Sequence, residues 1–152
     1  FIGEAPGKNE ALTGKPFCGA SGRILDELLK SIKLPREGVY ITNIMKDRPP
    51  QNRDPLPSEI EIYSPFLDRQ IEIIKPKVIA TLGRFSMKYI MDKFGLSNQL
   101  EPISQIHGSI FKVNTDLGEL NIIPLYHPAV VVYNSKSKDE LKADFKKLKK
   151  FI

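Results

Sequence analysis

The sequence has few of the features that mark membrane or secreted proteins. Its longest apolar runs, at residues 78–82 and 129–133, are far shorter than the roughly 20 residues that cross a bilayer. The chain opens with Phe1 in a strand-like stretch, without a charged segment or a small-residue cleavage site, so we expect a truncated N-terminus and no secretory signal. The single cysteine, Cys18, can form no internal disulfide and cannot hold a metal ion alone. These absences favour an intracellular, cytoplasmic protein.

Internal repeats, low-complexity tracts and interdomain linkers are also missing, which favours one domain over residues 1–152. The composition, 41% hydrophobic and 27% charged, is typical of a globular protein. A formal net charge of +5 favours polyanions as large partners, although many basic domains never bind nucleic acid. The lysines of residues 136–150 fit a solvated helix face, whereas Lys46, Arg48 and Arg53 crowd a proline-rich loop.

Strand and helix patterns alternate along the chain, which predicts an α/β fold. The predicted strands are residues 1–2, 39–41, 78–82, 109–113 and 120–123. The predicted helices are residues 21–31, 58–74, 85–94 and 138–151. A capping-box pattern of Ser58 and Glu61 opens the second helix, and a turn is expected at residues 116–118. We expect residues 3–22 and the proline-rich stretch after Asn43 to be loops. Helical spacing predicts buried faces formed by Ile24, Leu25, Leu28, Leu29, Ile32, Leu141, Phe145 and Leu148.

Three chemically distinctive segments each follow a predicted strand. They are the glycine-rich residues 3–7, the stretch 43–53, and the pair His127-Pro128. Ligands of open parallel sheets bind beyond the carboxyl ends of the strands, so we expect these segments to meet at one edge. The glycines before the helix at residue 21 also expose amides that suit an anion, although such turns are often only structural. The ending that a P-loop requires is absent.

Taken together, four motifs closely resemble the uracil-DNA glycosylase superfamily, in particular its family 4 branch. They are FIGEAPG at 1–7, LTGKPFCGASG at 12–22, VYITNIMKDRPP at 39–50 with Asn52 and Arg53, and YHPA at 126–129. The similarity is collinear over nearly the whole chain, including KPKVIATLG at 75–83. It implies a three-layer α/β/α fold around a central, mostly parallel four-stranded sheet. It also implies a monofunctional enzyme that excises uracil from DNA.

The resemblance assigns roles around an extruded uracil. Phe17 would stack on the ring, and the Asn43 amide would read O4 and N3, with Gly3 and Ala5 forming nearby backbone of the pocket. His127 would donate a hydrogen bond to the uracil oxygen on which negative charge develops. Simpler alternatives stay open: Phe17 as a core aromatic, Asn43 as a turn residue, and His127 as part of a capped turn.

A water molecule must also attack the sugar. In the best-known branch of the superfamily an aspartate assists that water, but the equivalent position here, as in family 4, is Ala5. Glu4 is then the nearest carboxylate, and we expect it to position the water or shape the pocket, unless it only caps loop amides.

Contacts to the DNA backbone are expected from the basic loop and from the start of the first helix. Such contacts position the DNA without reading its sequence. A merely solvated loop is the alternative, and His107 is either structural or faces the DNA. The residues assigned to the backbone are Ser21, Lys46, Arg48, Asn52, Arg53 and His107.

The sequence departs from family 4 at the iron–sulfur cluster that these enzymes usually carry on four cysteines. Two of the cysteine positions correspond to Asp47 and Ser64, which offer no thiolate, and the N-terminal pair has no counterpart in the chain. Cys18 is expected to be a pocket-wall residue without a nucleophilic role. We therefore predict no cluster, no metal and no other cofactor, with packing of Tyr63, Phe66 and Leu67 replacing the tie between loop and helix.

The leading hypothesis is a hydrolase of N-glycosyl bonds that converts uracil-containing DNA into free uracil and an abasic site. We expect a monomer with no membrane contact. The alternative is a catalytically weak or inactive DNA-binding relative that acts as a lesion sensor or polymerase accessory protein. A third possibility, a covalent link to the abasic sugar through a histidine of the proline-rich loop, is disfavoured because residues 46–53 contain no histidine.

Overall fold

The structure is a computed structural model that describes residues 1–116, 118–134 and 136–152, and its centre is a five-stranded sheet in the order β2-β1-β3-β5-β4. The pairs β1–β2, β1–β3 and β3–β5 are parallel, whereas β4 pairs antiparallel with β5. The expected mostly parallel sheet is confirmed. The resemblance implied four strands, whereas the sequence pattern predicted five, and the structure has five because β4 adds an antiparallel edge. The strands are β1 (Ile2–Gly3), β2 (Thr42–Asn43), β3 (Val78–Leu82), β4 (Phe111–Thr115) and β5 (Gly118–Leu125).

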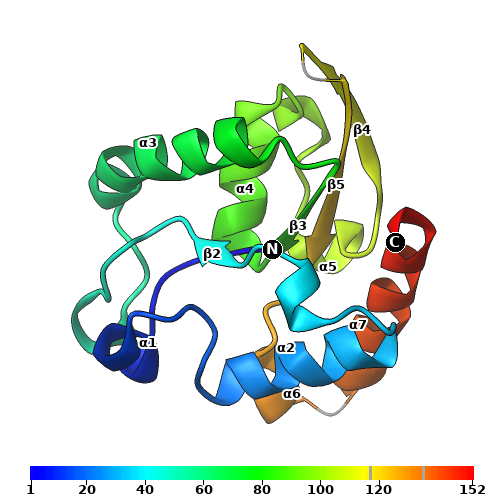
Figure 1. The fold of residues 1–152 in the computed structure, drawn as a ribbon. Coiled ribbons are helices and arrows are strands. Elements are labelled where there is room, and N and C mark those ends of the chain that lie inside the picture. The colour runs from blue at the N-terminus through cyan, green and yellow to red at the C-terminus, as the bar shows by residue number, and fades with distance from the viewer. Residues whose placement is uncertain (117, 135) are drawn as a thin grey trace.

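Helices cover both faces of the sheet, so the expected α/β/α layering is confirmed (Figure 1). On one face, Leu25, Phe145 and their apolar neighbours pack against Leu82 and Leu125 of the strands. On the other face, Leu67 and Ile90 pack against the opposite side of the sheet. The helices of the first layer are α2 (Ala20–Ser31) and α7 (Lys136–Lys147), and those of the second are α3 (Pro57–Ile74) and α4 (Arg84–Lys93).

Short helical segments occupy several of the predicted loops. The expectation of a loop throughout residues 3–22 is wrong, because α1 forms inside it, where the Glu10 carboxylate accepts the amide of Gly7 at the helix start. The short helices are α1 (Lys8–Thr13), α5 (Ile103–Ile106) and α6 (Val130–Tyr133). Turns of 3₁₀ helix lie at Arg36–Gly38, Pro50–Asn52, Ser97–Gln99 and Leu148–Phe151.

Several predicted boundaries differ from the structure by one to four residues, and two of the differences have a clear physical cause. The strand expected at residues 39–41 begins at Thr42, because the ladder with β1 pairs Ile2 with Thr42 and Gly3 with Asn43. Helix α3 begins at Pro57, and its capping carboxylate is Glu59, which accepts the Leu56 amide at 2.8 Å, in place of the expected pair of Ser58 and Glu61. The turn expected at residues 116–118 includes position 117, which lies outside the described residues.

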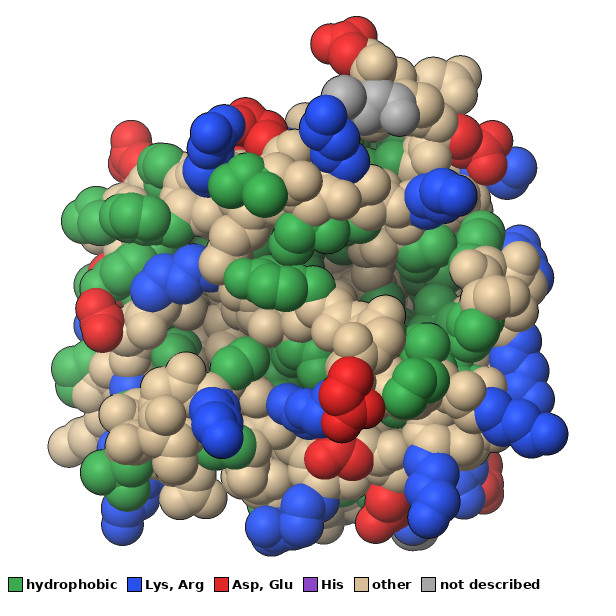
Figure 2. Space-filling model, in the orientation of Figure 1, with side chains coloured by type: hydrophobic (Ala, Val, Ile, Leu, Met, Phe, Trp, Pro, Cys, Tyr) green, Lys and Arg blue, Asp and Glu red, His purple; other side chains and the backbone are tan. Residues whose placement is uncertain are grey.

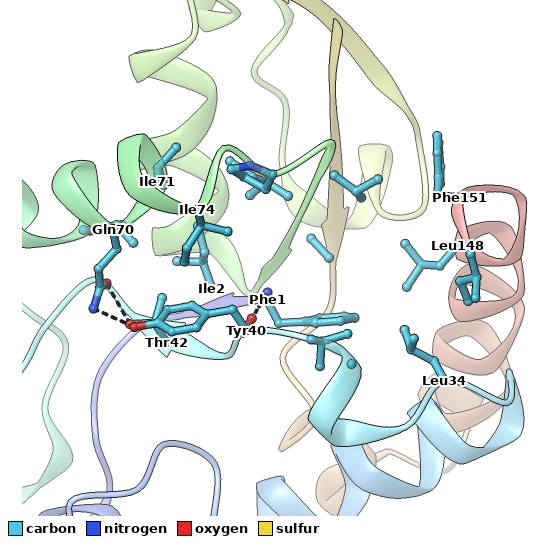
Figure 3. A pocket seen from close by; sticks show the side chains of 18 residues that line it. Phe1, Ile2, Leu34, Tyr40, Thr42, Gln70, Ile71, Ile74, Leu148 and Phe151 are labelled. Carbon is cyan, nitrogen blue, oxygen red and sulfur yellow. Dashed lines mark hydrogen bonds between the residues drawn. The ribbon is translucent and has the colours of Figure 1, made fainter. Parts of the chain in front are cut away.

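An apolar cavity of about 410 Å³ lies at the amino ends of the strands. Figure 3 shows Phe1, Tyr40 and Ile74 around it, with the Phe1 amino group donating to the Tyr40 carbonyl at 2.7 Å. Figure 2 shows the same hollow in the middle of this face, framed by apolar side chains, with Lys and Arg gathered at the right-hand edge over α7. This cavity is at the opposite end of the sheet from the segments that the sequence analysis singled out.

Candidate functional site

The carboxyl ends of the parallel strands bring the predicted residues together. Gly3 ends β1 and Asn43 ends β2, and the two are paired in the ladder. A Cβ atom on Gly3 would lie 2.7 Å from the Phe17 ring and closer still to Asn43 Oδ1, so glycine is required for this approach. The rings of Phe17 and His127 lie 5.7 Å apart between centroids, with their planes 33° apart. Four residues, one from each of the four sequence motifs, therefore border one site.

Asn43 carries the most informative atom of the site. The residue is 6% exposed, and its Oδ1 has no hydrogen-bond partner among the described residues. The backbone around it is fixed, because Ile44 N–H donates to Gly3 O and Lys46 Nζ donates to Asn43 O. A buried acceptor left unpaired costs about 1–3 kcal/mol. The amide is therefore held in a position that favours a ligand with a matching donor.

Phe17 is held in an uncommon backbone conformation. It has φ = +49°, which is rare for a residue other than glycine, and its side chain is buried. Gly22 of α2 packs directly against the Phe17 carbonyl, where a larger residue would collide. The ring is thus fixed by the turn and by α2, with Gly3 on one side and His127 on another.

His127 follows β5 and is oriented by its own turn. The backbone N–H of Ala129 donates to His127 Nδ1 at 3.1 Å, which assigns the imidazole proton to Nε2. Burial lowers the pKa of His127, although the Glu10 carboxylate opposes that shift. Gly83, with φ = +101°, gives the ring room, since a Cβ there would lie 3.3 Å from His127 Cβ. The side chain is therefore a neutral imidazole with a donor at Nε2.

Glu10 is a site residue that the sequence analysis missed. Its Oε1 accepts the amides of Cys18 and Gly19 at 2.9 Å each, and its Oε2 accepts the amide of Gly7. Burial raises the pKa of Glu10, but the backbone hydrogen bonds outweigh it and the net shift is downward. The available signal was its place three residues after Gly7, the usual position of a capping carboxylate. Glu10 joins the two glycine-rich loops beside Phe17.

Glu4 lies next to Gly3 on the same loop and is half-buried. Burial raises its pKa, the charge of Asp54 adds to the rise, and the charge of Arg84 opposes it. Arg84 Nη2 is paired with Asp54 Oδ2 at 2.6 Å. Ala5 continues the loop. The roles of Glu4 and Ala5 in positioning water and substrate stay predictions.

Several of the residues expected to contact DNA make contacts inside the protein. Lys46 Nζ donates to Thr42 Oγ1, Asn43 O and Gln70 Oε1, and burial lowers its pKa to about 8. Arg53 forms a two-pronged pair with Glu59 at 2.7 and 2.8 Å, which together with the Leu56 amide lowers the pKa of Glu59 to about 2.

The other expected DNA contacts differ in their surroundings. Arg48 is exposed, and its Nε donates to Asn52 Oδ1 at 2.7 Å. Ser21 lies in the first turn of α2 and is half-buried. The rings of His107 and Tyr126 lie 4.4 Å apart between centroids with their planes tilted by 31°, and His107 Nδ1 lies 2.6 Å from Asp144 Oδ2, a structural arrangement that links His107 to α7. The DNA contacts of all these residues stay predictions.

The positions compared with the iron–sulfur ligands do not offer a suitable donor set. Asp47 Oδ2 accepts a hydrogen bond from the Tyr63 hydroxyl, and the Ser64 hydroxyl is turned to the Glu61 carbonyl. Cys18 is exposed and lies 3.2 Å from Thr13 Oγ1, in a different loop. In the described ranges, no three His, Cys, Asp or Glu side chains are grouped as metal ligands would be. A carboxylate and a serine hydroxyl do not fit a cluster held by thiolates.

Comparison with known proteins shows the family of the chain. The profile of the uracil DNA glycosylase superfamily matches residues 1–149. The type-4 uracil-DNA glycosylase of Archaeoglobus fulgidus is 47% identical over 148 residues, which are 97% of this chain and 73% of the relative. That of Sulfurisphaera tokodaii is 47% identical over 150 residues, 98% and 67% of the two chains. A DNA polymerase of Bacillus phage SP01 is 27% identical over 140 residues, 91% of this chain and 14% of the polymerase. The chain belongs to the uracil-DNA glycosylase superfamily.

Proposed function

We propose that the protein is a uracil-DNA glycosylase, which hydrolyses the N-glycosidic bond of a uracil extruded from DNA and leaves an abasic site. The observation that carries the proposal is the buried, unpartnered Asn43 Oδ1 beside the Phe17 ring and the His127 imidazole. The family membership and the names of the relatives support the same chemistry.

Recognition follows from the donors and acceptors of the base. Uracil presents an N3–H donor that suits Asn43 Oδ1 and an O4 acceptor that suits the amide NH₂. Cytosine presents an acceptor at N3 and a donor at C4, so both contacts become unfavourable. A polar site rejects a mismatched ligand strongly because its buried groups are then left unpaired. The Phe17 ring supplies a stacking surface for the extruded base.

Bond cleavage requires stabilisation of charge on the departing base. As the C1′–N1 bond breaks, its electron pair leaves with uracil and charge spreads onto the carbonyl oxygens. His127, neutral with its proton on Nε2, is suited to donate a hydrogen bond to O2. A water oxygen then bonds to C1′ and releases a proton, and Glu4 is the carboxylate beside the site that we assign to orient this water.

The backbone of the DNA would follow the basic loop and the start of α2. We assign the main phosphate contacts to Arg48, which is exposed, and to Asn52, whose Oδ1 accepts a hydrogen bond from Arg48 Nε. Ser21 would add a phosphate contact from α2. We propose that the protein acts as a monomer. Among the described residues, no helix combines the length and the apolar character that crossing a membrane requires.

Uracil excision is tested by incubating the protein with an oligonucleotide that contains one uracil, followed by alkali to break the strand at abasic sites. The expected result is cleavage at the uracil and none in a matched oligonucleotide with thymine or cytosine. Binding of the oligonucleotide without cleavage would favour the alternative of an inactive, DNA-binding relative. If the protein neither cleaves nor binds the oligonucleotide, both the enzyme hypothesis and the alternative of an inactive DNA-binding relative are refuted.

A further inference from the structure

The proline-rich loop that precedes α3 is tied along one stripe of that helix. Lys46 Nζ donates to Gln70 Oε1 at 2.9 Å, the Tyr63 hydroxyl donates to Asp47, and Arg53 pairs with Glu59. The helix partners are residues 59, 63 and 70, which are spaced by four and seven and therefore lie on one face. Three polar links thus hold the loop to α3, and the middle one is the pair of Asp47 and Tyr63.

The loop needs such links because it has little regular structure of its own. Gln51 and Asn52 both have φ = +54°, an uncommon conformation for residues other than glycine. Regular structure in this stretch is limited to one 3₁₀ turn at Pro50–Asn52. Within the loop, Arg48 donates to Asn52 Oδ1. Displacing residue 47 would therefore move Arg48 and, through it, the Asn52 side chain.

The link includes Asp47, one of the two positions where the resemblance to family 4 implies a cysteine, and Tyr63, the neighbour of the other position, Ser64. The α3 residue that faces Asp47 is Tyr63, since the Ser64 hydroxyl is directed to Glu61 O. Ligands of one cluster must point into the same space between the loop and α3. The two side chains that meet there are the carboxylate of Asp47 and the phenol of Tyr63. The residues present therefore do not fit an iron–sulfur cluster, and the hydrogen bond between Asp47 and Tyr63 joins the loop to α3 in its place.

We propose that Asp47 and Tyr63 are positioning residues, whose hydrogen bond fixes the loop on α3 and so orients Arg48 and Asn52 toward the DNA backbone without an iron–sulfur cluster. The role in DNA binding rests on the proposed function, whereas the fixing of the loop does not. The link acts on the phosphate contacts: Asp47 lines the same hollow as Asn43, but its hydrogen bond to Tyr63 involves none of the three side chains assigned to the base. It should therefore affect substrate binding more than the chemical step.

The test compares Tyr63→Phe with Tyr89→Phe in the 152-residue chain. Each variant removes one tyrosine hydroxyl that donates to an aspartate, but Tyr89 of α4 binds Asp68 of α3, so its hydrogen bond to the aspartate joins two helices and does not hold the loop. We expect Tyr63→Phe to speed hydrogen exchange of amides 46–53 and to raise KM for a uracil oligonucleotide roughly fivefold, the scale of one hydrogen bond to an exposed charge, with kcat within about twofold. Tyr89→Phe should change neither. Asp47→Asn, which keeps a carbonyl acceptor, should stay closer to the unmodified chain than Tyr63→Phe.

Equal loop exchange in Tyr63→Phe and Tyr89→Phe would overturn the proposal, whatever the activity. A fall in kcat with an unchanged KM would also contradict it, because the link would then act on the chemistry. The purified chain should contain no stoichiometric iron. It should also bind a uracil-free oligonucleotide equally well before and after dialysis against a chelator. If dialysis removes iron and DNA binding is lost with it, the proposal is refuted. If uracil is not excised at all, the exchange and DNA-binding measurements still decide the role of the link.

Discussion

Replacing Asn43 by alanine should separate activity from stability. Two hydrogen bonds to uracil at about 1 kcal/mol each amount to about 2 kcal/mol, a loss of roughly 30-fold in kcat/KM. In the free protein the same side chain buries an unpaired Oδ1, which costs about 1–3 kcal/mol and is relieved by truncation. This relief offsets the lost packing, so we expect the free energy of unfolding to change by less than about 1 kcal/mol, a Tm shift within about 4 °C.

Asn121 provides a matched control for this variant. It is also buried with an unpaired Oδ1, but it lies in β5 opposite Val78, away from the site. Asn121→Ala should therefore retain kcat/KM on a uracil oligonucleotide, with thermal unfolding measured in parallel. The reasoning fails if Asn43→Ala keeps full activity. It also fails if Asn43→Ala lowers Tm by much more than 4 °C, because the amide would then be a structural group.

Four further outcomes follow from the geometry of the site. His127→Ala should slow the chemical step by about 10² or more in single-turnover assays while retaining DNA binding, the scale of one lost oxyanion donor, and an unchanged rate would remove His127 from that role. Asn43→Asp should relax discrimination against cytosine, measured by cleavage of paired uracil and cytosine oligonucleotides. Because burial lowers the pKa of His127, kcat should be flat from about pH 7 to 8 and fall only below the ordinary imidazole pKa near 6.5, where protonation breaks the bond from Ala129; a fall in kcat that begins above pH 6.5 would contradict it. Gly3→Ala should abolish uracil binding in a folded protein, since its Cβ would meet Asn43 and Phe17.

The meeting of Gly3, Asn43 and His127 could be predicted because it depends on strand direction alone. Each residue ends or follows a parallel strand, and the carboxyl ends of parallel strands share one edge. The buried leucines of α2 and α7 were likewise predictable, since helical spacing determines which positions face the sheet.

The directions of polar side chains could not be predicted in the same way. Lys46 and Arg53 look like phosphate contacts in the sequence, but Gln70 and Glu59 of α3 bind them, and only the packing of the loop on that helix reveals this. The positive φ of Phe17 goes together with a hydrogen bond from the next amide, that of Cys18, to the Glu10 carboxylate of another segment. Such polar contacts join residues from segments that share no periodicity, so no local sequence pattern predicts them.

If the proposed roles hold, the Glu10 carboxylate makes base selection and bond cleavage difficult to evolve separately. It accepts hydrogen bonds from the amides that follow Phe17, the ring proposed to stack on the base, and its charge also acts on His127, the imidazole proposed to assist cleavage. A substitution that reshapes this turn to admit a larger or differently substituted base would at the same time alter the protonation of His127. Variants with new base preferences should therefore arise through Asn43 and its neighbours, with the acid at position 10 retained.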